Sequence, residues 1–242
     1  MAKTAGIVII GNEVLSGKTQ DINSHFFCTE LRQLGVEVQK ISTIQDEIPL
    51  IGKEVAEFSH RFDYVFTSGG VGPTHDDVTI EGIAHGFGIN VVRHPDIEAR
   101  MRRRLGADVN EARLRMANVP EGATLLCADA PFAPIVQIRN VYVFPGIPKI
   151  LQERFHNIKE QFRDAPYYLK NVYVRHGEGI IATMLNDLLA KYPKLMLGSY
   201  PVLDLPEYKV KVTLESKDPN YLTQALAAFV ASLPQDSVHR ID

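Results

Sequence analysis

The stretch "FTSGGVGPTHDDVT", residues 66–79, passes from a strand-like run to a helix start through a loop with three glycines within four positions. Glycine permits close approach of the backbone to a ligand, and the free N–H groups and dipole at a helix start attract anions. We therefore expect a phosphate or pyrophosphate to bind here. The ligand-binding residues expected in this loop are Ser68, Gly69, Gly70, Gly72, Pro73 and Thr74.

Two adjacent carboxylates, Asp76 and Asp77, follow the glycines. Carboxylates beside an anion site predict a bound divalent cation or acid–base chemistry, so we assign both as metal ligands and Asp77 as catalytic as well. A helix cap is the alternative, because Thr74 and Asp77 have the spacing of a capping box with Asp in place of Glu or Gln. A cap alone does not account for the three glycines. His75 is expected to have a structural role.

The first strand-like run ends at Gly11 and is followed by "GNEVLSGKTQDIN". A nucleotide-triphosphate P-loop has four residues between its first glycine and its Gly-Lys pair, whereas five separate Gly11 from Gly17 here. The strand expected at 63–68 also ends without the Asp that would hold magnesium in those enzymes. We therefore exclude a P-loop and give the lysine and threonine after Gly17 no phosphate-binding role.

The same segment still lies at the carboxyl edge of the predicted sheet, where open α/β folds bind their ligands. We expect Gly11, Glu13, Asp21 and Asn23 to contact the ligand. Asp21 and Asn23 open the next predicted helix, and a helix cap is the alternative role for Asp21.

A third loop, "FPGIPK" at 144–149, has the same form: a strand ends, the chain turns, and a helix begins. It would lie at the same edge of the sheet as the other two loops. We therefore expect Pro145, Gly146 and Pro148 to bind the ligand, with a plain tight turn as the alternative.

Strand-like and helix-like segments alternate along the first two-thirds of the chain. This order is typical of an α/β fold with a mostly parallel sheet covered by helices on both faces. The expected strands are 5–10, 36–43, 63–68, 89–93 and 141–144, and the expected helices are 22–35, 48–62, 78–88, 95–106 and 148–162.

The pattern changes near Pro166, where the order becomes β-α-β-β-α. The last strand of this tail, within 207–216, alternates apolar and polar residues as a half-buried strand does. We expect a small α+β subdomain, with domains at 1–165 and 166–242 and "RDAPYY" as the linker.

Composition narrows the function classes. The chain has 242 residues and a formal net charge of −3, so no global charge favours nucleic acid or a membrane surface. No run approaches the ~20 apolar residues that span a bilayer, and "MAKTAG" has no secretory pattern. Cys28 and Cys127 lack CxxC spacing and are expected to be small buried residues. A cytoplasmic protein with a small-molecule partner is the expectation.

The helix expected at 95–106 carries four arginines, and two more follow it. A solvated helix face is the plain interpretation. A lid whose guanidinium groups reach ligand phosphates is the alternative, because the Arg fork matches phosphate geometry. The arginines are Arg100, Arg102, Arg103, Arg104, Arg113 and Arg115.

Taken together, "GNEVLSGKTQDIN", "SGGVGPTHDDVT" and "FPGIP" resemble the MoaB/Mog-type molybdopterin-binding family. Within it, the chain is most similar to the competence/damage-inducible protein A branch and to the molybdopterin-binding-like domain of eukaryotic FAD synthase. The tail "LGSYP…EYKVKVTLES" resembles the subdomain that follows in both. The likeness covers nearly the whole chain, and "GGxGPTxDD" is a specific motif.

The resemblance implies a three-layer α/β core, a pocket for molybdopterin or a nucleotide-like pyrophosphate, and a symmetric homo-oligomer. In cofactor-assembling members, the aspartates that match Asp46 (in "IQDE") and Asp77 are functionally important. The damage-inducible branch is associated with metal-dependent hydrolysis of ADP-ribose-type pyrophosphates, and the eukaryotic relative with FAD hydrolysis.

Two departures from the family pattern stand out. Many relatives carry "GTAPGF" before the last core strand, where this chain reads "ADAPFAPIVQI", so the pocket lining near Phe132 is expected to differ. The acidic and Ser residues that follow "PGIP" in many relatives are also missing. The sequence ends without a deamidase or FAD-synthesising domain, so neither activity is expected.

Two functions follow from these features. The first is a hydrolase of ADP-ribose- or FAD-type pyrophosphates, with a divalent cation (Mg or Co) held by Asp77, Asp46 and Asp76. The alternative is a non-catalytic protein that binds molybdopterin in molybdenum cofactor biosynthesis. A regulatory protein that retains the fold without the chemistry is a third option.

Overall fold

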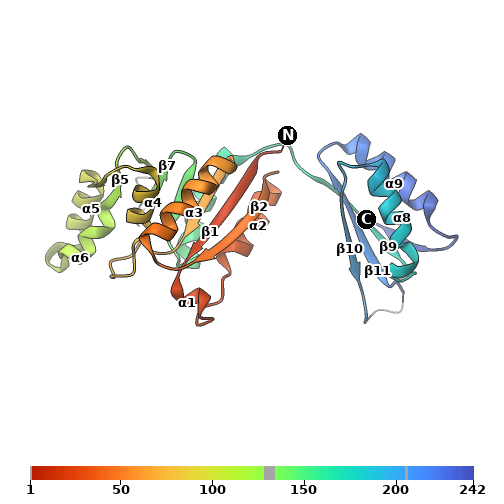
Figure 1. The fold of residues 1–242 in the computed structure, drawn as a ribbon, viewed down its shortest axis with the longest axis horizontal. Helices are drawn as coiled ribbons and strands as arrows, with labels where there is room; N and C mark the ends of the chain where they lie inside the picture. Colours follow the sequence, from red (N-terminus) through yellow and green to blue (C-terminus); the bar gives the residue numbers. More distant parts are fainter. Residues whose placement is uncertain (1, 128–133, 205–206) are drawn as a thin grey trace. The chain divides into compact units, whose positions relative to one another are not determined.

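The computed structural model describes residues 2–127, 134–204 and 207–242. The chain folds as two compact units, Met1–Asp164 and Ala165–Asp242 (Figure 1). No helix in the described ranges is both long enough and apolar enough to cross a bilayer.

The first unit is built on a six-stranded sheet with the order β2-β1-β3-β8-β7-β6. Four neighbouring strands, β2, β1, β3 and β8, are parallel, which confirms the predicted mostly parallel sheet. β7 and β6 extend it antiparallel. The strands are β1 (Thr4–Ile10), β2 (Glu37–Ile44), β3 (Tyr64–Ser68), β6 (Thr124–Leu126), β7 (Ile135–Ile138) and β8 (Val141–Phe144).

Residues of β1 alternate between two separate hydrophobic clusters. Ile7 and Ile9 pack on the face that is covered by α2 (Asn23–Gln33) and α7 (Pro148–Ile158). Val8 and Ile10 pack on the opposite face, against α3 (Ile48–Arg61) and α4 (Thr79–Phe87). Successive strand residues point to opposite faces, so one strand supplies both cores. The result is the predicted three-layer α/β arrangement.

The segment between α4 and β6 adds a small lobe to this unit. Its two short strands, β4 (Val91–Arg93) and β5 (Asn118–Pro120), pair antiparallel. Between them lie α5 (Pro95–Leu105), η1 (Gly106–Asp108), α6 (Glu111–Leu114) and the 3-10 turn η2 (Arg115–Ala117) (Figure 1). The pairing of β5 with β4 places η2 beside the carboxyl edge of the main sheet.

The strand β7 was not predicted. It pairs with β8 through a hairpin whose two connecting residues are Arg139 and Asn140, with Arg139 at a φ of 54°. Two-residue hairpin loops need such positive φ values, which Asn and Gly usually supply. Because "RN" is a weak turn signal, the sequence did not indicate a hairpin here, and only its second strand was predicted.

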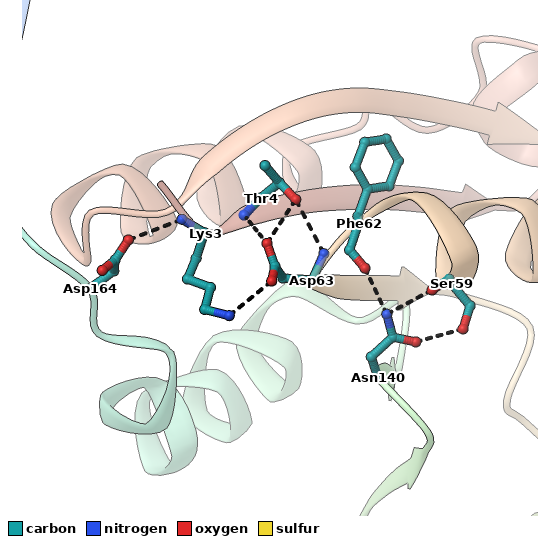
Figure 2. Close-up of polar contacts among 7 residues, drawn as sticks. All are labelled: Lys3, Thr4, Ser59, Phe62, Asp63, Asn140 and Asp164. Carbon is teal, nitrogen blue, oxygen red and sulfur yellow. Dashed lines mark hydrogen bonds and ion pairs between the residues drawn. The ribbon is translucent and has the colours of Figure 1, made fainter. Parts of the chain in front are cut away.

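The amino edge of the first sheet is closed by a polar network around Asp63 (Figure 2). One oxygen of its carboxylate accepts from Lys3 Nζ at 2.9 Å, and the other accepts from the backbone N–H of Thr4 at 2.9 Å and from the Thr4 hydroxyl at 3.0 Å. The hydrogen bond from Lys3 is the largest cause that lowers the pKa of Asp63. This network joins the start of β1 to the start of β3.

A second set of bonds at this edge centres on Asn140, just before β8 (Figure 2). Its Nδ2 donates to the carbonyl oxygens of Ser59 at 3.0 Å and Phe62 at 2.8 Å. Its Oδ1 accepts from the Ser59 hydroxyl at 2.6 Å. The end of α3 is therefore tied to the β7–β8 hairpin.

The second unit is a four-stranded antiparallel sheet in the order β10-β11-β9-β12. Helices α8 (Glu178–Lys191) and α9 (Pro219–Ser232) pack on one face through a single apolar cluster. This confirms the predicted small α+β unit, to which β12 adds a strand that was not predicted. The strands are β9 (Tyr168–Val174), β10 (Met196–Pro201), β11 (Val210–Ser216) and β12 (Val238–Ile241).

Candidate functional site

A cavity of about 640 Å³ opens at the carboxyl edge of the first sheet. Residues that follow β1, β3 and β8 contribute to its wall, so three loops that are distant in sequence meet there. The predicted site residues that line it are Glu13, Gly69, Gly70, Gly72, Pro73, Asp77, Pro145, Gly146 and Pro148.

The glycine loop after β3 is held by contacts with β1 and with the start of α4. Gly69 has a φ of 109°, and a Cβ there would lie 2.0 Å from the carbonyl oxygen of Ile10. The fully buried Thr79, at the start of α4, donates its hydroxyl to Gly69 O at 2.9 Å and its backbone N–H to Gly70 O at 3.0 Å. Only glycine fits at position 69, and the loop is fixed against both β1 and α4.

The acidic part of this loop is organised by Thr74. Oδ2 of Asp77 accepts from the backbone N–H of Thr74 at 2.8 Å, as a capping side chain does. The Thr74 hydroxyl lies 2.6 Å from Oδ2 of Asp77 and 2.6 Å from Oδ1 of Asp76, and its one proton serves one carboxylate at a time. Its hydrogen bond lowers the pKa of Asp76. His75 is almost fully exposed.

Asp46 lies after β2 and does not line the cavity. Its Oδ2 accepts from the backbone N–H of Asn12 at 2.8 Å, which holds the start of the short helix α1 (Asn12–Leu15). Burial is the main cause that raises its pKa, and the charges of Glu13, Asp76 and Asp77 raise it further. The four carboxylates therefore share one region of negative potential.

Asn23 links the three loops from a position outside the cavity wall. It is buried, and its Nδ2 donates to the Ser68 hydroxyl at 3.0 Å and to the Gly146 carbonyl at 2.8 Å. The Ser68 hydroxyl is also 3.4 Å from Pro145 O. Asn23 and Ser68 thus position the loops and do not line the cavity.

The remaining predicted contacts serve the backbone. Asp21 accepts from the N–H groups of Asn23 and Ser24, both at 3.0 Å, which is the capping alternative for this residue. The N–H of Gly11 donates to Ile44 O at 3.1 Å. Like Thr74 and Asp76, neither residue lines the cavity.

Arg115 and Met116 line the cavity from η2, and Asn118 lines it from the start of β5. Among the arginines near α5, its position could not be distinguished by sequence. Arg102 pairs with Glu98 on the helix surface, at 2.9 and 2.6 Å, and Arg113 donates to the carbonyl of Asp108. For Arg102 the solvated-face interpretation applies.

Much of the cavity wall is apolar, a feature that the sequence pattern did not predict. These side chains come from the glycine loop, α4, η2, β7, β8, the loop after β8 and α7. An apolar wall beside a few polar groups suits a flat aromatic ring. The apolar residues are Val71, Ile80, Met116, Val136, Val143, Ile147 and Ile150.

A divalent cation fits this site only with help from a ligand. In the described part of the chain, no three His, Cys, Asp or Glu side chains are grouped to hold a metal ion. Mg²⁺ is often held by one or two carboxylates together with substrate phosphates. Asp77 and Glu13 in the wall, with the negative potential around Asp46, fit that mode.

Two sequence expectations concern other parts of the first unit. Phe132 lies outside the described residues, as does most of the segment that departs from the family pattern. Cys28 and Cys127 are unpaired and half-buried, against the cluster under α2 and α7. Burial raises the pKa of the Cys28 thiol.

Two family models match the chain. Residues 6–164 match a model described as a probable molybdopterin binding domain. Residues 166–242 match a model described as the middle domain of FAD synthase.

Individual proteins are similar over most of the chain. A probable FAD synthase of Caenorhabditis elegans is 35% identical over 96% of this chain and 49% of its own length. An archaeal protein of Archaeoglobus fulgidus is 34% identical over 92% of this chain and 95% of its own length. This chain thus spans about half the length of the Caenorhabditis relatives.

Among solved structures, the fold is similar to that of the protein CinA, of unknown function, from Thermoplasma acidophilum. The TM-score is 0.62 and the identity 28%, over 67% of this chain and 100% of that chain.

Proposed function

The chain belongs to the family of the probable molybdopterin binding domain, and from this premise we propose that its cavity binds a nucleotide or a pterin through a phosphate or pyrophosphate group. The observation that carries the proposal is the cavity itself. It joins a glycine loop and a helix start to three carboxylates, one guanidinium and an apolar wall. Its volume of about 640 Å³ lies within the ordinary range for small-molecule pockets.

The wall suggests how such a ligand is oriented. A base or pterin ring would lie against Ile80, Val136 and Val143, and the phosphates would lie at the glycine loop. Glycine-rich loops favour anions because glycine has no side chain, so the backbone N–H groups of the loop can approach the anion closely. The names of the relatives, FAD synthase among them, support a flavin or adenine nucleotide as one ligand class.

We further propose that the site hydrolyses pyrophosphates of the ADP-ribose or FAD type. Water would attack one phosphorus and break the bond to the bridging oxygen, so ADP-ribose would yield AMP and ribose 5-phosphate. Asp77 would orient the attacking water and accept its proton. Glu13, in the loop after β1, would help to hold the cation. A divalent cation such as Mg²⁺ or Co²⁺, bound with the phosphates, would neutralise charge on the phosphoryl oxygens.

The roles of the other aspartates differ in this proposal. Asp46 holds α1, and therefore the loop of Glu13, through the N–H of Asn12. Asp76 shares the Thr74 hydroxyl with Asp77. Both would act on the reaction through the position and charge of their neighbours, with Asp76 as an additional cation ligand.

The test is release of AMP from ADP-ribose or FAD by the purified chain with Mg²⁺ or Co²⁺. Asp77→Asn is preferred to Asp77→Ala, because Asn keeps an acceptor for the Thr74 N–H. We expect kcat to fall at least about 100-fold. Asp63→Asn, at the amino edge, is the matched control and should keep kcat.

Full activity of Asp77→Asn would refute this mechanism. If the wild type releases no AMP with either metal, the proposed hydrolysis is wrong and binding alone remains. Recovery of a pterin from the pure protein, seen as fluorescence after oxidation, would then favour the non-catalytic alternative.

A further inference from the structure

Arg115 has an unusual set of neighbours in the cavity wall. Its Nη1 lies 3.3 Å from Thr74 O, and its Nη2 lies 3.3 Å from Asp77 O and 3.4 Å from Glu81 Oε1. Two of the three acceptors are therefore backbone carbonyls of the acidic loop. The third is a carboxylate from α4 that also lines the cavity.

All three contacts are long. Charge-assisted N–H···O bonds are usually about 2.7–2.9 Å, and the surface pair Arg102–Glu98 in the same unit reaches 2.9 and 2.6 Å. The Arg115 side chain is 36% exposed, so it is also accessible from the cavity. Its fork of donors is held in place but is weakly bound, and it can form shorter bonds to another group.

Because most charged side chains of the cavity wall are acidic, the binding of an anion depends strongly on the guanidinium of Arg115. Among the described residues that line the cavity, Glu13, Asp77 and Glu81 are acidic and Arg115 is the one basic side chain. A phosphate that enters meets more negative than positive charge. Among the described lining residues, Arg115 is the one side chain whose charge attracts it, and Glu81 is the carboxylate already in contact with that side chain.

We propose that Arg115 is the specificity-determining anchor for a phosphoryl group of the ligand, and that Glu81 competes with this group for the guanidinium. The inference rests on the proposed phosphate binding in this cavity. A phosphoryl group offers two oxygens to the Arg fork and displaces the single long contact with Glu81. The carbonyls of Thr74 and Asp77 keep the side chain near the acidic loop, so the anchored phosphate lies beside Asp77.

The test is isothermal titration of the full chain with inorganic pyrophosphate at a fixed Mg²⁺ concentration. Arg115→Ala is expected to weaken binding at least about tenfold, as loss of charged hydrogen bonds does. Arg115→Lys should be intermediate, because it keeps the charge and loses the fork. If Arg115→Ala fails to fold, Arg115→Lys alone tests the proposal.

Glu81→Gln tests the competition. It is expected to tighten pyrophosphate binding about two- to fivefold, in line with the loss of a partly exposed ion pair. The gain should vanish in the double variant Glu81→Gln/Arg115→Ala, because Glu81 then has no guanidinium to occupy. Glu98→Gln, which breaks the surface pair with Arg102, removes the same charge outside the cavity and should leave binding unchanged.

Three results from the variants would overturn the inference. They are wild-type affinity in both Arg115→Ala and Arg115→Lys, weaker binding in Glu81→Gln, and an equal gain from Glu81→Gln with and without Arg115. Absence of pyrophosphate binding in the wild type would overturn it as well. Hydrolysis is measured separately as AMP release, so failed turnover with intact pyrophosphate binding rejects the proposed hydrolase and leaves the role of Arg115 standing.

Discussion

The two edges of the first sheet use polar residues in opposite ways. At the amino edge, the side chains of Asp63 and Asn140 are engaged by several partners each, at 2.6–3.0 Å (Figure 2). In the cavity wall at the carboxyl edge, the hydrogen bonds of Arg115 to described residues are long, at 3.3–3.4 Å, and Asp76 and Asp77 share one hydroxyl. The side chains of the amino edge hold the fold. At the carboxyl edge, Asn23 and Asp46 also hold the backbone, whereas Arg115 in the cavity wall keeps capacity to bind.

The same contrast appears in the pKa values of two carboxyls. At the amino edge, the hydrogen bond from Lys3 is the leading cause of the lowered pKa of Asp63. At the carboxyl edge, burial raises the pKa of Asp46, and neighbouring carboxylates add to this. The lowered pKa of Asp63 means that its surroundings favour the charged carboxylate, and the raised pKa of Asp46 means that its surroundings disfavour it. Substitutions at each edge test this division.

The largest expected effect is at the carboxyl edge and involves backbone alone. Gly69→Ala places a Cβ 2.0 Å from Ile10 O at a φ of 109°. We expect the free energy of unfolding to fall by about 3 kcal/mol or more, measured by urea denaturation. Gly17→Ala is the control, because its φ of 72° is also positive but no atom lies within 4 Å. It should cost about 1–2 kcal/mol, and equal losses in the two variants would contradict the role of close packing.

The next effect is at the amino edge. Asn140→Ala removes the donor to the Ser59 and Phe62 carbonyls and should lower the free energy of unfolding by about 2 kcal/mol. Ser59→Ala removes only the bond to Asn140 Oδ1 and should cost about 1 kcal/mol. Pyrophosphate affinity should be unchanged in both. A loss of affinity without a loss of stability would break the division between the edges.

A smaller effect is expected for Asp63→Asn, whose side chain is 35% exposed. We expect a loss of about 1 kcal/mol at pH 7, since exposed pairs are screened by solvent. Because the folded-state pKa is lowered, this stabilisation is present above the unfolded pKa and is lost as pH falls through the folded value. The stability difference between wild type and variant should therefore shrink on acidification, and a difference independent of pH would argue against the charge.

The smallest effect has the opposite sign. Asp46→Asn keeps an acceptor for the Asn12 N–H and removes a charge that lies near Glu13, Asp76 and Asp77. It should stabilise the protein at pH 7 by less than about 1 kcal/mol. The raised pKa means that the penalty in the wild type exists above the folded pKa and is relieved as pH falls. Destabilisation by Asp46→Asn at pH 7 would show that the carboxylate supports the fold.

The carboxyl edge could be predicted from sequence to a large extent, because its signals are local. Three glycines before an acidic helix start, and Pro-Gly-x-Pro after a strand, are recognisable without knowledge of distant contacts. The parallel sheet followed from the alternation of strands and helices. Local pattern also left Asp21 with two roles, and the structure shows the capping one.

Other features depend on contacts that the local sequence does not encode. In the sequence, Arg115 could not be distinguished from the arginines of α5. The pairing of β4 with β5 places it at the cavity. The apolar wall combines β7, α4 and η2, which are far apart in the chain. β12 is four residues long, and its pairing with β9 decides its conformation. In each case tertiary contacts, and not intrinsic preference, determine the outcome.

The amide of Asn23 has a consequence for the order of folding. It bonds to residues 45 and 123 positions away in the chain, so the cavity cannot close until β8 and the loop after it have joined the sheet. Contacts of such long sequence separation form slowly. A ligand of the cavity would therefore report on chains that have completed the first unit, and by mass action it would stabilise those chains alone.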